Sequence, residues 1–413
     1  MKSKFTLVAI LLILAMLPLS LFGCNGAQET SGTSESTSAT TTKKQEDATP
    51  QLEGTEYVLK DNIDKIKING RYTVSNSGIA CDNVGSGIEF QGTMKGKVYL
   101  TFNAARIVWG ETKNVYYTVY VDGVRQEERY EVPCGKNGIV LTLADFGETE
   151  GEHRIRVVKQ TEAHYALAYF AKITMDGTFG ERPADKDYLV EFVGSDLICG
   201  MGNYNGTPEQ QPSAAQVAEY EDGTKSMSFI AAESLHADCS ILGVSGMGVA
   251  GSWFGVTAPE YYKANSYFRN KKTEYDFSKG RTPDLIVLNI GKNDNNIPVA
   301  DRPTDEVFKQ TAKEYLELLK ETHGEDVKII WTYDITEANP DRKPEPLEAN
   351  DCRYKIAQEV IEELGGEEAG LYIYQVYTNR LGGQEHTDAE GHVTAATGLL
   401  NFIREKGILP VAE

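Results

Sequence analysis

The stretch that decides the fold is LIVLNIGKND, residues Leu285–Asp294, in which a run of apolar residues leads directly into a glycine and three polar residues. An apolar run of this length, broken only by Asn289, is typical of a strand that is buried on both faces, as in a parallel sheet. After residue 185, similar runs alternate with helical segments. The other runs are Tyr188–Val193, Cys239–Val244, Val327–Trp331 and Leu371–Val376, and two of the helical segments are Asp305–Thr322 and Arg353–Leu364. This alternation predicts a flavodoxin-like, three-layer α/β/α domain with a parallel sheet over residues 183–413.

Residues 53–182 have a different pattern, with a period of two. Apolar and polar residues alternate in Lys97–Phe102, Tyr116–Val121 and His153–Val158, and no long helical segment interrupts them. Asp122-Gly123 follows the second of these segments and is a dipeptide typical of a hairpin turn. The pattern predicts an antiparallel β-sandwich of the jelly-roll type. Such a domain can bind a partner, brace its neighbour, or do both.

The N-terminus resembles that of bacterial lipoproteins. Two lysines precede the apolar stretch Phe5–Phe22, and Gly23 is followed directly by Cys24. A transmembrane anchor is the alternative, because 18 residues just reach across a bilayer. The small residue before the cysteine favours a signal peptide over residues 1–23 and lipidation of Cys24, which would anchor the chain to the bacterial cell membrane on its extracytoplasmic side. Residues 24–52 are rich in Ser and Thr, so we expect a flexible tether there.

The composition excludes some partners. The chain has 413 residues, with 61 acidic and 41 basic ones, which gives a formal net charge of −20. Because such a surface repels phosphate groups, we expect no nucleic-acid partner and no electrostatic docking to anionic lipid.

The cysteines that remain after processing have scattered spacings, so we expect buried thiols with at most one or two disulfides. His386 and His392 are six residues apart and do not share a helix face, so no metal site is predicted.

Polar segments that contain glycine follow four of the predicted strands. They cover residues 194–203, 245–248, 291–294 and 386–392. Ligands of parallel α/β sheets bind at the carboxyl ends of the strands, so these loops are expected to form the functional site. Together they can supply a hydroxyl nucleophile, an imidazole base and hydrogen-bond donors for an oxyanion, which are the requirements of acyl transfer. Such a reaction needs no metal or organic cofactor.

These motifs carry a resemblance to a known family. Residues 185–413 resemble an SGNH (GDSL-type) hydrolase. The whole folded chain, with the link Lys159–Glu162, is similar to carbohydrate esterase family 2. Proteins of that family pair a jelly roll with an SGNH domain and remove acetyl groups from polysaccharides and sugars. The resemblance therefore implies the same fold and an acetylated polysaccharide or oligosaccharide as the partner.

The resemblance also assigns site residues. The Gly-x-Asn-Asp motif of the family is matched by Gly291–Asp294, its second-block glycine by Gly246 and its catalytic histidine by His386. The resemblance implies that Gly246 and Asn293 donate hydrogen bonds to the oxyanion and that His386 is the base. We interpret Asp294 as mainly structural.

The first block departs from the family pattern. The family has Gly-Asp-Ser, whereas this chain has Gly194-Ser195-Asp196, so Asp196 takes the position of the nucleophile. A shift of one residue moves a hydroxyl by roughly 3.3 Å along an extended chain and turns it to the opposite face. Ser195 therefore needs a rearranged turn to reach His386.

The carboxylate that often supports the histidine is also missing, because Gly383 and Gln384 occupy its usual positions. Glu385 and Asp388 are nearby substitutes. A backbone carbonyl can serve instead, as it is said to do in some members of the family. Thr387 and Glu390 have the spacing of a capping box, which predicts a helix start just after His386.

Two functions follow from these residues. The first is an extracytoplasmic esterase that hydrolyses O-acetyl esters on polysaccharides or sugars, with Ser195 as nucleophile and His386 as base. The second is a catalytically degenerate SGNH protein that is retained as a carbohydrate-binding or surface-assembly lipoprotein. The persistence of Gly246, Asn293 and His386 favours the enzyme, and the exchange of Ser195 and Asp196 favours the degenerate protein.

Overall fold

A computed structural model describes residues 52–103, 114–213, 216–266, 274–337 and 352–410. These residues belong to one compact unit that runs from Gln51 to Glu413. The predicted signal peptide, Cys24 and almost all of the predicted tether lie outside the described residues, so the statements about them stay predictions. Within the described ranges, no helix combines the length and the apolar character that crossing a membrane requires.

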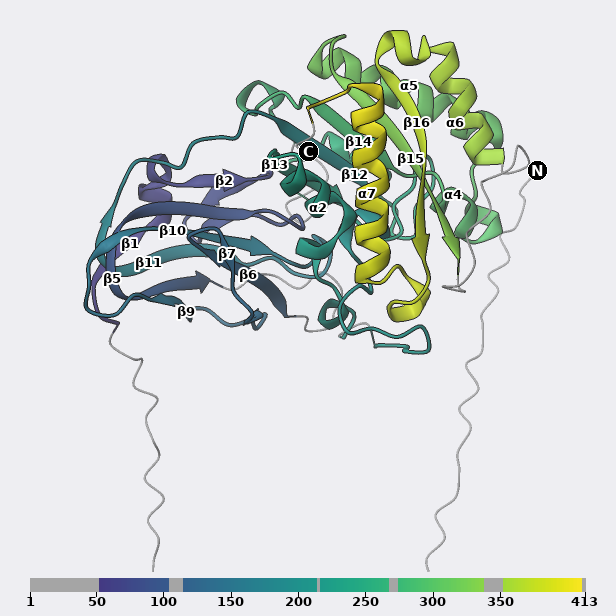
Figure 1. Cartoon of the computed structure of the whole chain (residues 1–413). Coiled ribbons are helices and arrows are strands. Elements are labelled where there is room, and N and C mark those ends of the chain that lie inside the picture. The colour runs from purple at the N-terminus through teal and green to yellow at the C-terminus, as the bar shows by residue number, and fades with distance from the viewer. Residues whose placement is uncertain (1–51, 104–113, 214–215, 267–273, 338–351, 411–413) are drawn as a thin grey trace, which may run out of the picture. The chain divides into compact units, whose positions relative to one another are not determined.

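The N-terminal part of the described chain is built from antiparallel strands, as the alternating pattern predicts (Figure 1). The first half of the long strand β5 (Gly87–Asn103) pairs with β2 (Lys67–Asn69) and β10 (Gly151–Lys159), and its second half pairs with β9 (Ile139–Asp145). Strand β11 (Tyr169–Phe179) pairs with both halves. A single cluster of buried aliphatic and aromatic side chains forms the core of this domain. The remaining strands are β1 (Thr55–Val58), β3 (Thr73–Ser75), β4 (Gly78–Ala80), β6 (Val115–Val121), β7 (Val124–Arg125) and β8 (Tyr130–Val132).

The predicted hairpin turn is present between β6 and β7. Asp122 and Gly123 both have positive φ values, 51° and 80°. This is the backbone conformation of a type I′ turn, which matches the twist of the two strands that it joins.

The C-terminal part contains a parallel sheet of five strands in the order β13-β12-β14-β15-β16. This is the strand order of a flavodoxin-like domain, in which the order reverses next to the first strand. The last two strands extend past the predicted apolar runs, because ladder hydrogen bonds between neighbouring strands do not require apolar side chains. The strands are β12 (Leu189–Gly194), β13 (Asp238–Gly243), β14 (Leu285–Asn289), β15 (Lys328–Glu337) and β16 (Leu371–Asn379).

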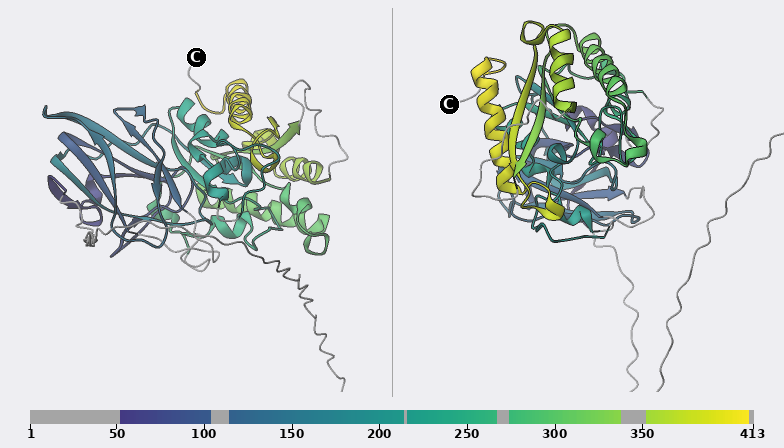
Figure 2. Two further views of the ribbon diagram at one scale, coloured as in Figure 1. Left: turned by 90° about the horizontal axis from the view of Figure 1, so that it is seen from below. Right: turned by 90° about the vertical axis from the view of Figure 1, so that its right-hand side faces the viewer.

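Helices cover both faces of this sheet and complete the three predicted layers. One core cluster packs the sheet against α3, α5 and α6, and a second packs it against α1, α2 and α7. Figure 2 shows α7 on one side of the sheet and α5 on the other. The helices are α1 (Asp196–Cys199), α2 (Met227–Ser234), α3 (Ala258–Tyr262), α4 (Asn293–Asn296), α5 (Asp305–His323), α6 (Cys352–Glu363) and α7 (Ala389–Lys406).

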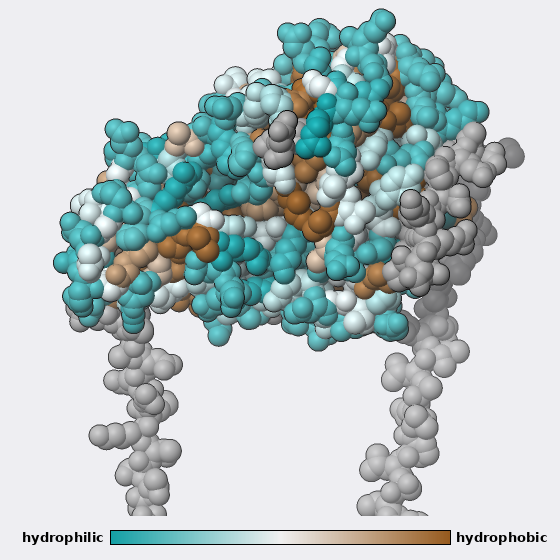
Figure 3. Space-filling view, viewed as in Figure 1, coloured by the Kyte–Doolittle hydropathy of each residue, from teal (hydrophilic) through white to brown (hydrophobic). Residues whose placement is uncertain are grey.

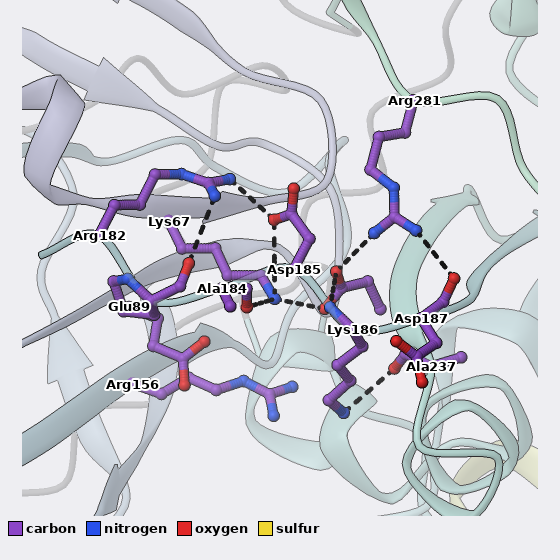
Figure 4. A network of polar contacts seen from close by, with 12 residues as sticks. Lys67, Glu89, Arg156, Arg182, Ala184, Asp185, Lys186, Asp187, Ala237 and Arg281 are labelled. Atoms are coloured by element: carbon purple, nitrogen blue, oxygen red, sulfur yellow. Dashed lines mark hydrogen bonds and ion pairs between the residues drawn. The ribbon is translucent and has the colours of Figure 1, made fainter.

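Two ion pairs join the antiparallel domain to the α/β domain, and the one formed by Lys67 is buried (Figure 4). The Lys67 side chain of β2 is 2% exposed, and its Nζ donates to Asp238 Oδ1 at 2.6 Å and to the Ala184 carbonyl at 3.0 Å. Arg156 of β10 pairs with Glu233 of α2 at 3.0 Å. A buried charge is tolerated only with a partner, so the Lys67 ammonium depends on both domains being in place.

The described cysteines agree with the prediction of buried thiols. Cys81, Cys134, Cys199 and Cys239 are free and buried. Burial raises the pKa of each thiol, that of Cys134 to about 11, so reactive thiolates are suppressed.

Hydrophilic residues predominate on the face of the molecule drawn in Figure 3, with smaller hydrophobic patches between them. Large hydrophobic side chains that are exposed are scattered along the described chain, as is usual for a folded domain. They are Tyr72, Val74, Val124, Trp253, Val299, Val307, Tyr377 and Val393.

His392 is a buried histidine that links two helices. It lies on α7 with no exposed surface, and its Nδ1 accepts a hydrogen bond of 3.1 Å from the backbone N–H of Met227 on α2. Burial lowers its pKa from 6.5 to about 3, so the ring stays neutral in the folded protein throughout the neutral pH range.

This lowered pKa predicts a pH-dependent loss of stability. Between pH 6.5 and 3 the unfolded chain binds a proton at His392 that the folded chain does not. The contribution of His392 to the unfolding free energy therefore falls by about 1.4 kcal/mol for each pH unit below 6.5. In His392→Asn, Oδ1 replaces Nδ1 as the acceptor and the titration is removed. Urea unfolding at pH 4.5 and pH 7 is expected to show a smaller difference in this variant than in the parent chain, and equal differences would contradict the prediction.

Candidate active site

Ser195 lies where β12 ends and α1 begins, at the carboxyl edge of the parallel sheet. Its hydroxyl oxygen accepts hydrogen bonds from Gly246 N at 2.8 Å and from Asn293 Nδ2 at 2.7 Å. The same hydroxyl donates to Asp196 Oδ2 at 2.9 Å. Because Gly246 follows β13 and Asn293 follows β14, one oxygen atom joins the loops after three neighbouring strands.

The two donors have the arrangement of an oxyanion hole. Both lie within 2.8 Å of a single oxygen atom, which is the distance that an oxyanion-hole donor needs. Gly246 has a φ of +82°, and a Cβ placed there would lie 2.9 Å from Cβ of Trp253. Glycine is therefore required at this position both by the backbone conformation and by the packing of Trp253.

Asp294 holds the loop that contains the first donor. Its side chain has no exposed surface, and its two carboxylate oxygens accept hydrogen bonds from the backbone N–H groups of Val249, Ala250 and Gly251 at 2.8, 2.7 and 2.7 Å. Asn293 adds a hydrogen bond of 3.2 Å to the carbonyl of Met247. The interpretation of Asp294 as a structural residue agrees with these contacts.

His386 directly follows the 3-10 helix η8 (Gly383–Glu385). Its Nδ1 lies 3.1 Å from the Gly383 carbonyl, which can only accept, so Nδ1 carries the proton. Its Nε2 lies 3.8 Å from Asp196 Oδ1. Within the described chain, the hydrogen bonds of the Ser195 hydroxyl join it to Gly246, Asn293 and Asp196. The direct hydrogen bond to His386 that the expected mechanism needs is not among them.

Neither of the proposed carboxylate substitutes supports the imidazole. Glu385 pairs with Arg380, and Asp388 accepts a hydrogen bond of 2.8 Å from Gly391 N. The backbone carbonyl of Gly383 takes the supporting role instead.

The predicted capping box is wrong, because the N-cap of α7 is Asp388, one residue later than Thr387. Asp388 also accepts from the Asn379 amide, which fixes it in the capping position.

The chain turns sharply before His386. Gln384 and Glu385 both adopt positive φ values, 55° and 59°, although neither is glycine. Consecutive left-handed residues cost on the order of 1 kcal/mol each, and such strain gathers at functional sites. The turn belongs to the wall of the cavity that His386 lines.

One cavity of about 410 Å³ collects the residues that the sequence singled out. Ser195, Asp196, Asn293 and His386 line it together, and Gly246 reaches it through its hydrogen bond to Ser195. Three of the four predicted loops thus line the cavity, and the fourth, residues 245–248, is joined to it by the hydrogen bond from Gly246 to Ser195. The chemical role of each residue stays a prediction.

Sequence reasoning missed the charged residues that also line this cavity. Lys292 pairs with Asp334, and Arg380 pairs with Glu385. Lys292 occupies the variable position of the Gly-x-Asn-Asp motif, so a pattern search passes over it.

Within the described ranges, no three His, Cys, Asp or Glu side chains gather in a way that could hold a metal ion.

The comparisons with known proteins agree with this architecture. The family described as Carbohydrate esterase 2 N-terminal matches residues 68–183. The cellulase/esterase CelE of Acetivibrio thermocellus is 26% identical over 242 residues, which are 57% of this chain and 27% of CelE. The acetylxylan esterase / glucomannan deacetylase of Cellvibrio japonicus is 23% identical over 185 residues, 44% of this chain and 49% of that protein. The chain thus spans no more than about half the length of these relatives.

The fold has a close counterpart among solved structures. The family two carbohydrate esterase from Clostridium thermocellum, solved in complex with cellohexaose, superposes with a TM-score of 0.68 at 20% sequence identity. The superposition covers 83% of this chain and 100% of that one. The chain is therefore similar to carbohydrate esterase family 2 in its fold, with an antiparallel N-terminal domain followed by a parallel-sheet α/β domain.

The role of Asp294 predicts a large loss of stability in Asp294→Ala. Three buried backbone N–H groups would lose their acceptor, and each unpaired group costs about 1–3 kcal/mol, so we expect a total of at least about 3 kcal/mol. Asp301→Ala is the matched control, because Asp301 is exposed and should change stability by less than about 0.5 kcal/mol. Urea unfolding followed by tryptophan fluorescence gives both values. Similar midpoints for the two variants would show that Asp294 does not hold the loop.

Proposed function

We propose that this chain is an extracytoplasmic esterase, anchored by a lipid on Cys24, that hydrolyses O-acetyl esters on polysaccharides or sugars. The observation that carries the proposal is the convergence of Gly246 N and Asn293 Nδ2 on one oxygen atom, at 2.8 and 2.7 Å. Such a pair of donors is suited to the oxygen of a tetrahedral intermediate in acyl transfer. The names of the relatives, a cellulase/esterase and an acetylxylan esterase, support an acetylated carbohydrate as the substrate.

The position of Trp253 supports a sugar substrate independently. Its side chain packs against Gly246, yet the residue is 50% exposed. An exposed aromatic ring that packs against the backbone of an oxyanion-hole donor provides an apolar surface for the face of a sugar ring. The acetyl group would then enter the cavity while the sugar rests outside it.

The reaction begins when the carbonyl oxygen of the ester replaces the Ser195 hydroxyl between the two donors. The freed hydroxyl attacks the carbonyl carbon, and its proton passes by way of the Asp196 carboxylate, which already accepts a hydrogen bond from Ser195, to Nε2 of His386. The tetrahedral intermediate collapses, and the sugar oxygen leaves with a proton from His386. Water then attacks the acetyl-Ser195 ester, which releases acetate and restores the hydroxyl. Each oxyanion donor contributes about 3 kcal/mol to the transition state.

A second candidate function is carbohydrate binding without turnover at the same cavity. The observation that favours it is the present position of Ser195, whose hydroxyl occupies both donors while Asp196 faces His386. A carboxylate beside the oxyanion would repel the charge that the two donors stabilise. The chain would then hold a polysaccharide at the cavity and leave its acetyl groups in place.

Acetate release separates these functions. We expect the full chain to release acetate from an aryl acetate and from acetylated xylan, and Ser195→Ala and His386→Ala to lose at least about a thousandfold in kcat. Ser77→Ala, which changes an exposed serine of the antiparallel domain, should match the parent chain. Full activity in Ser195→Ala would exclude Ser195 as the nucleophile.

The double variant Ser195→Asp with Asp196→Ser restores the Gly-Asp-Ser order of the family. If the chain is a binding protein, we expect no acetate release from the parent chain and a gain of activity in the double variant. Retention of both proteins on an insoluble, acetylated polysaccharide column measures binding in parallel. A parent chain that neither releases acetate nor is retained would contradict both functions.

A further inference from the structure

Glu162 is a buried carboxylate that reaches from the end of the antiparallel domain to the loop of the oxyanion hole. It follows strand β10, and its side chain has no exposed surface. Its Oε2 accepts a hydrogen bond of 2.6 Å from Ser245 N, and its Oε1 accepts one from Ser245 Oγ. Ser245 directly precedes Gly246 in the chain, although 83 residues separate it from Glu162.

Glu162 keeps its negative charge despite its burial. Burial by itself would raise its pKa, but the neighbouring His164, 2.9 Å away, and the hydrogen bonds from Ser245 outweigh this effect, so the pKa lies below its usual value. The nearby Glu221 behaves in the opposite way, because burial and the charge of Glu162 raise its pKa. The lowered pKa of Glu162 favours its carboxylate form, which accepts both hydrogen bonds from Ser245.

The turn that carries Glu162 is itself fixed. Lys159 is fully buried, and its Nζ donates to the carbonyls of Asp82 at 2.8 Å and of Glu162 at 3.0 Å. Burial lowers the pKa of Lys159 to about 8, while the surrounding carboxylates favour its charged form. The backbone N–H of Gly85 also donates to the Lys159 carbonyl at 2.9 Å. Contacts within the antiparallel domain thus fix the backbone at Glu162, independently of its contact with Ser245.

Ser245 donates two hydrogen bonds to one carboxylate, which restricts the movement of its backbone and its side chain. Its N–H, which belongs to the peptide before it, and its hydroxyl are both bound, so the residue from which the peptide to Gly246 extends is held in place. That peptide carries the N–H that donates to Ser195 Oγ at 2.8 Å. A rotation of this peptide would turn the Gly246 N–H away from Ser195 Oγ, even though Ser195 and Gly246 themselves were unchanged.

We propose that Glu162 is a positioning residue for the oxyanion hole, which aims the Gly246 N–H through its two hydrogen bonds to Ser245. The inference rests on the proposed function for its effect on turnover. It also gives the antiparallel domain a role in the site, because the carboxylate that sets the loop comes from the end of that domain.

The test uses Glu162→Gln in the full chain. The amide keeps the shape of the side chain but removes its charge and one of its two acceptors, so the Ser245 N–H loses a charge-assisted bond and the bond to the Ser245 hydroxyl must reverse its direction. Because the Gly246 N–H acts mainly in the transition state, we expect kcat for acetate release to fall by about 10- to 100-fold. KM should change by less than about threefold.

Two further variants sharpen the kinetic test. Glu150→Gln is the matched control, because Glu150 is exposed in a turn of the same domain and should leave both constants unchanged. Ser245→Ala removes one of the two bonds and should lower kcat less than Glu162→Gln. The double variant should lose less than the product of the single losses, because both changes act on one contact. An unchanged kcat in Glu162→Gln, or a change confined to KM, would overturn the inference.

A measurement without turnover separates this inference from the proposed function. In the chain labelled with ¹⁵N-glycine, we expect the assigned amide resonance of Gly246 to shift in Glu162→Gln and to stay in place in Glu150→Gln. If the parent chain releases no acetate, the proposed function fails, but the Gly246 resonance still reports whether Glu162 sets that N–H. An unchanged resonance in Glu162→Gln would overturn the inference whatever the activity.

Discussion

The hydroxyl oxygen of Ser195 is the atom around which the site is organised. It satisfies two donors from separate loops and donates to a carboxylate from its own loop. These loops meet because β12 lies between β13 and β14, so that their carboxyl ends share one edge of the sheet. Buried donors need an acceptor, and Ser195 supplies it while no ester occupies the cavity. An ester that binds here therefore competes with a hydrogen-bonded arrangement that is already complete.

The exchange of Ser195 and Asp196 changes the electrostatics of the site in two opposite ways. Asp196 Oδ1 lies 3.8 Å from His386 Nε2, on the path between the Ser195 hydroxyl and the imidazole. The charge of this carboxylate repels an oxyanion between Gly246 and Asn293. Two unit charges about 4 Å apart interact by roughly 4 kcal/mol in a protein environment, which is comparable to the contribution of one oxyanion donor. One carboxylate thus helps the proton transfer and opposes the charge development, and the balance of these effects separates an esterase from a binding protein.

The antiparallel domain is more than an attached module. Lys67 and Arg156 form ion pairs with residues of the α/β domain, and Glu162 contacts the loop that precedes Gly246. Buried charged groups lose their partners if the domains separate, so these contacts favour a single arrangement of the two. The geometry of the cavity therefore depends on residues that are distant from it in the sequence and belong to the other domain.

The sequence by itself determined both fold classes, the approximate strand positions and the four loops that meet at the cavity. These features follow from local patterns: a period of two marks an exposed antiparallel sheet, and uninterrupted apolar runs mark a buried parallel one. The resemblance to a known family then named Gly246, Asn293 and His386, and the exchange in the first block left Ser195 as the candidate nucleophile beside Asp196. Only the tertiary structure decided how these residues contact one another. It placed Asp196 between Ser195 and His386, gave the support of His386 to a backbone carbonyl, and brought Glu162 to Ser245. Hydrogen-bond partners depend on distances of a few tenths of an ångström between residues far apart in the chain, and no local pattern records such distances.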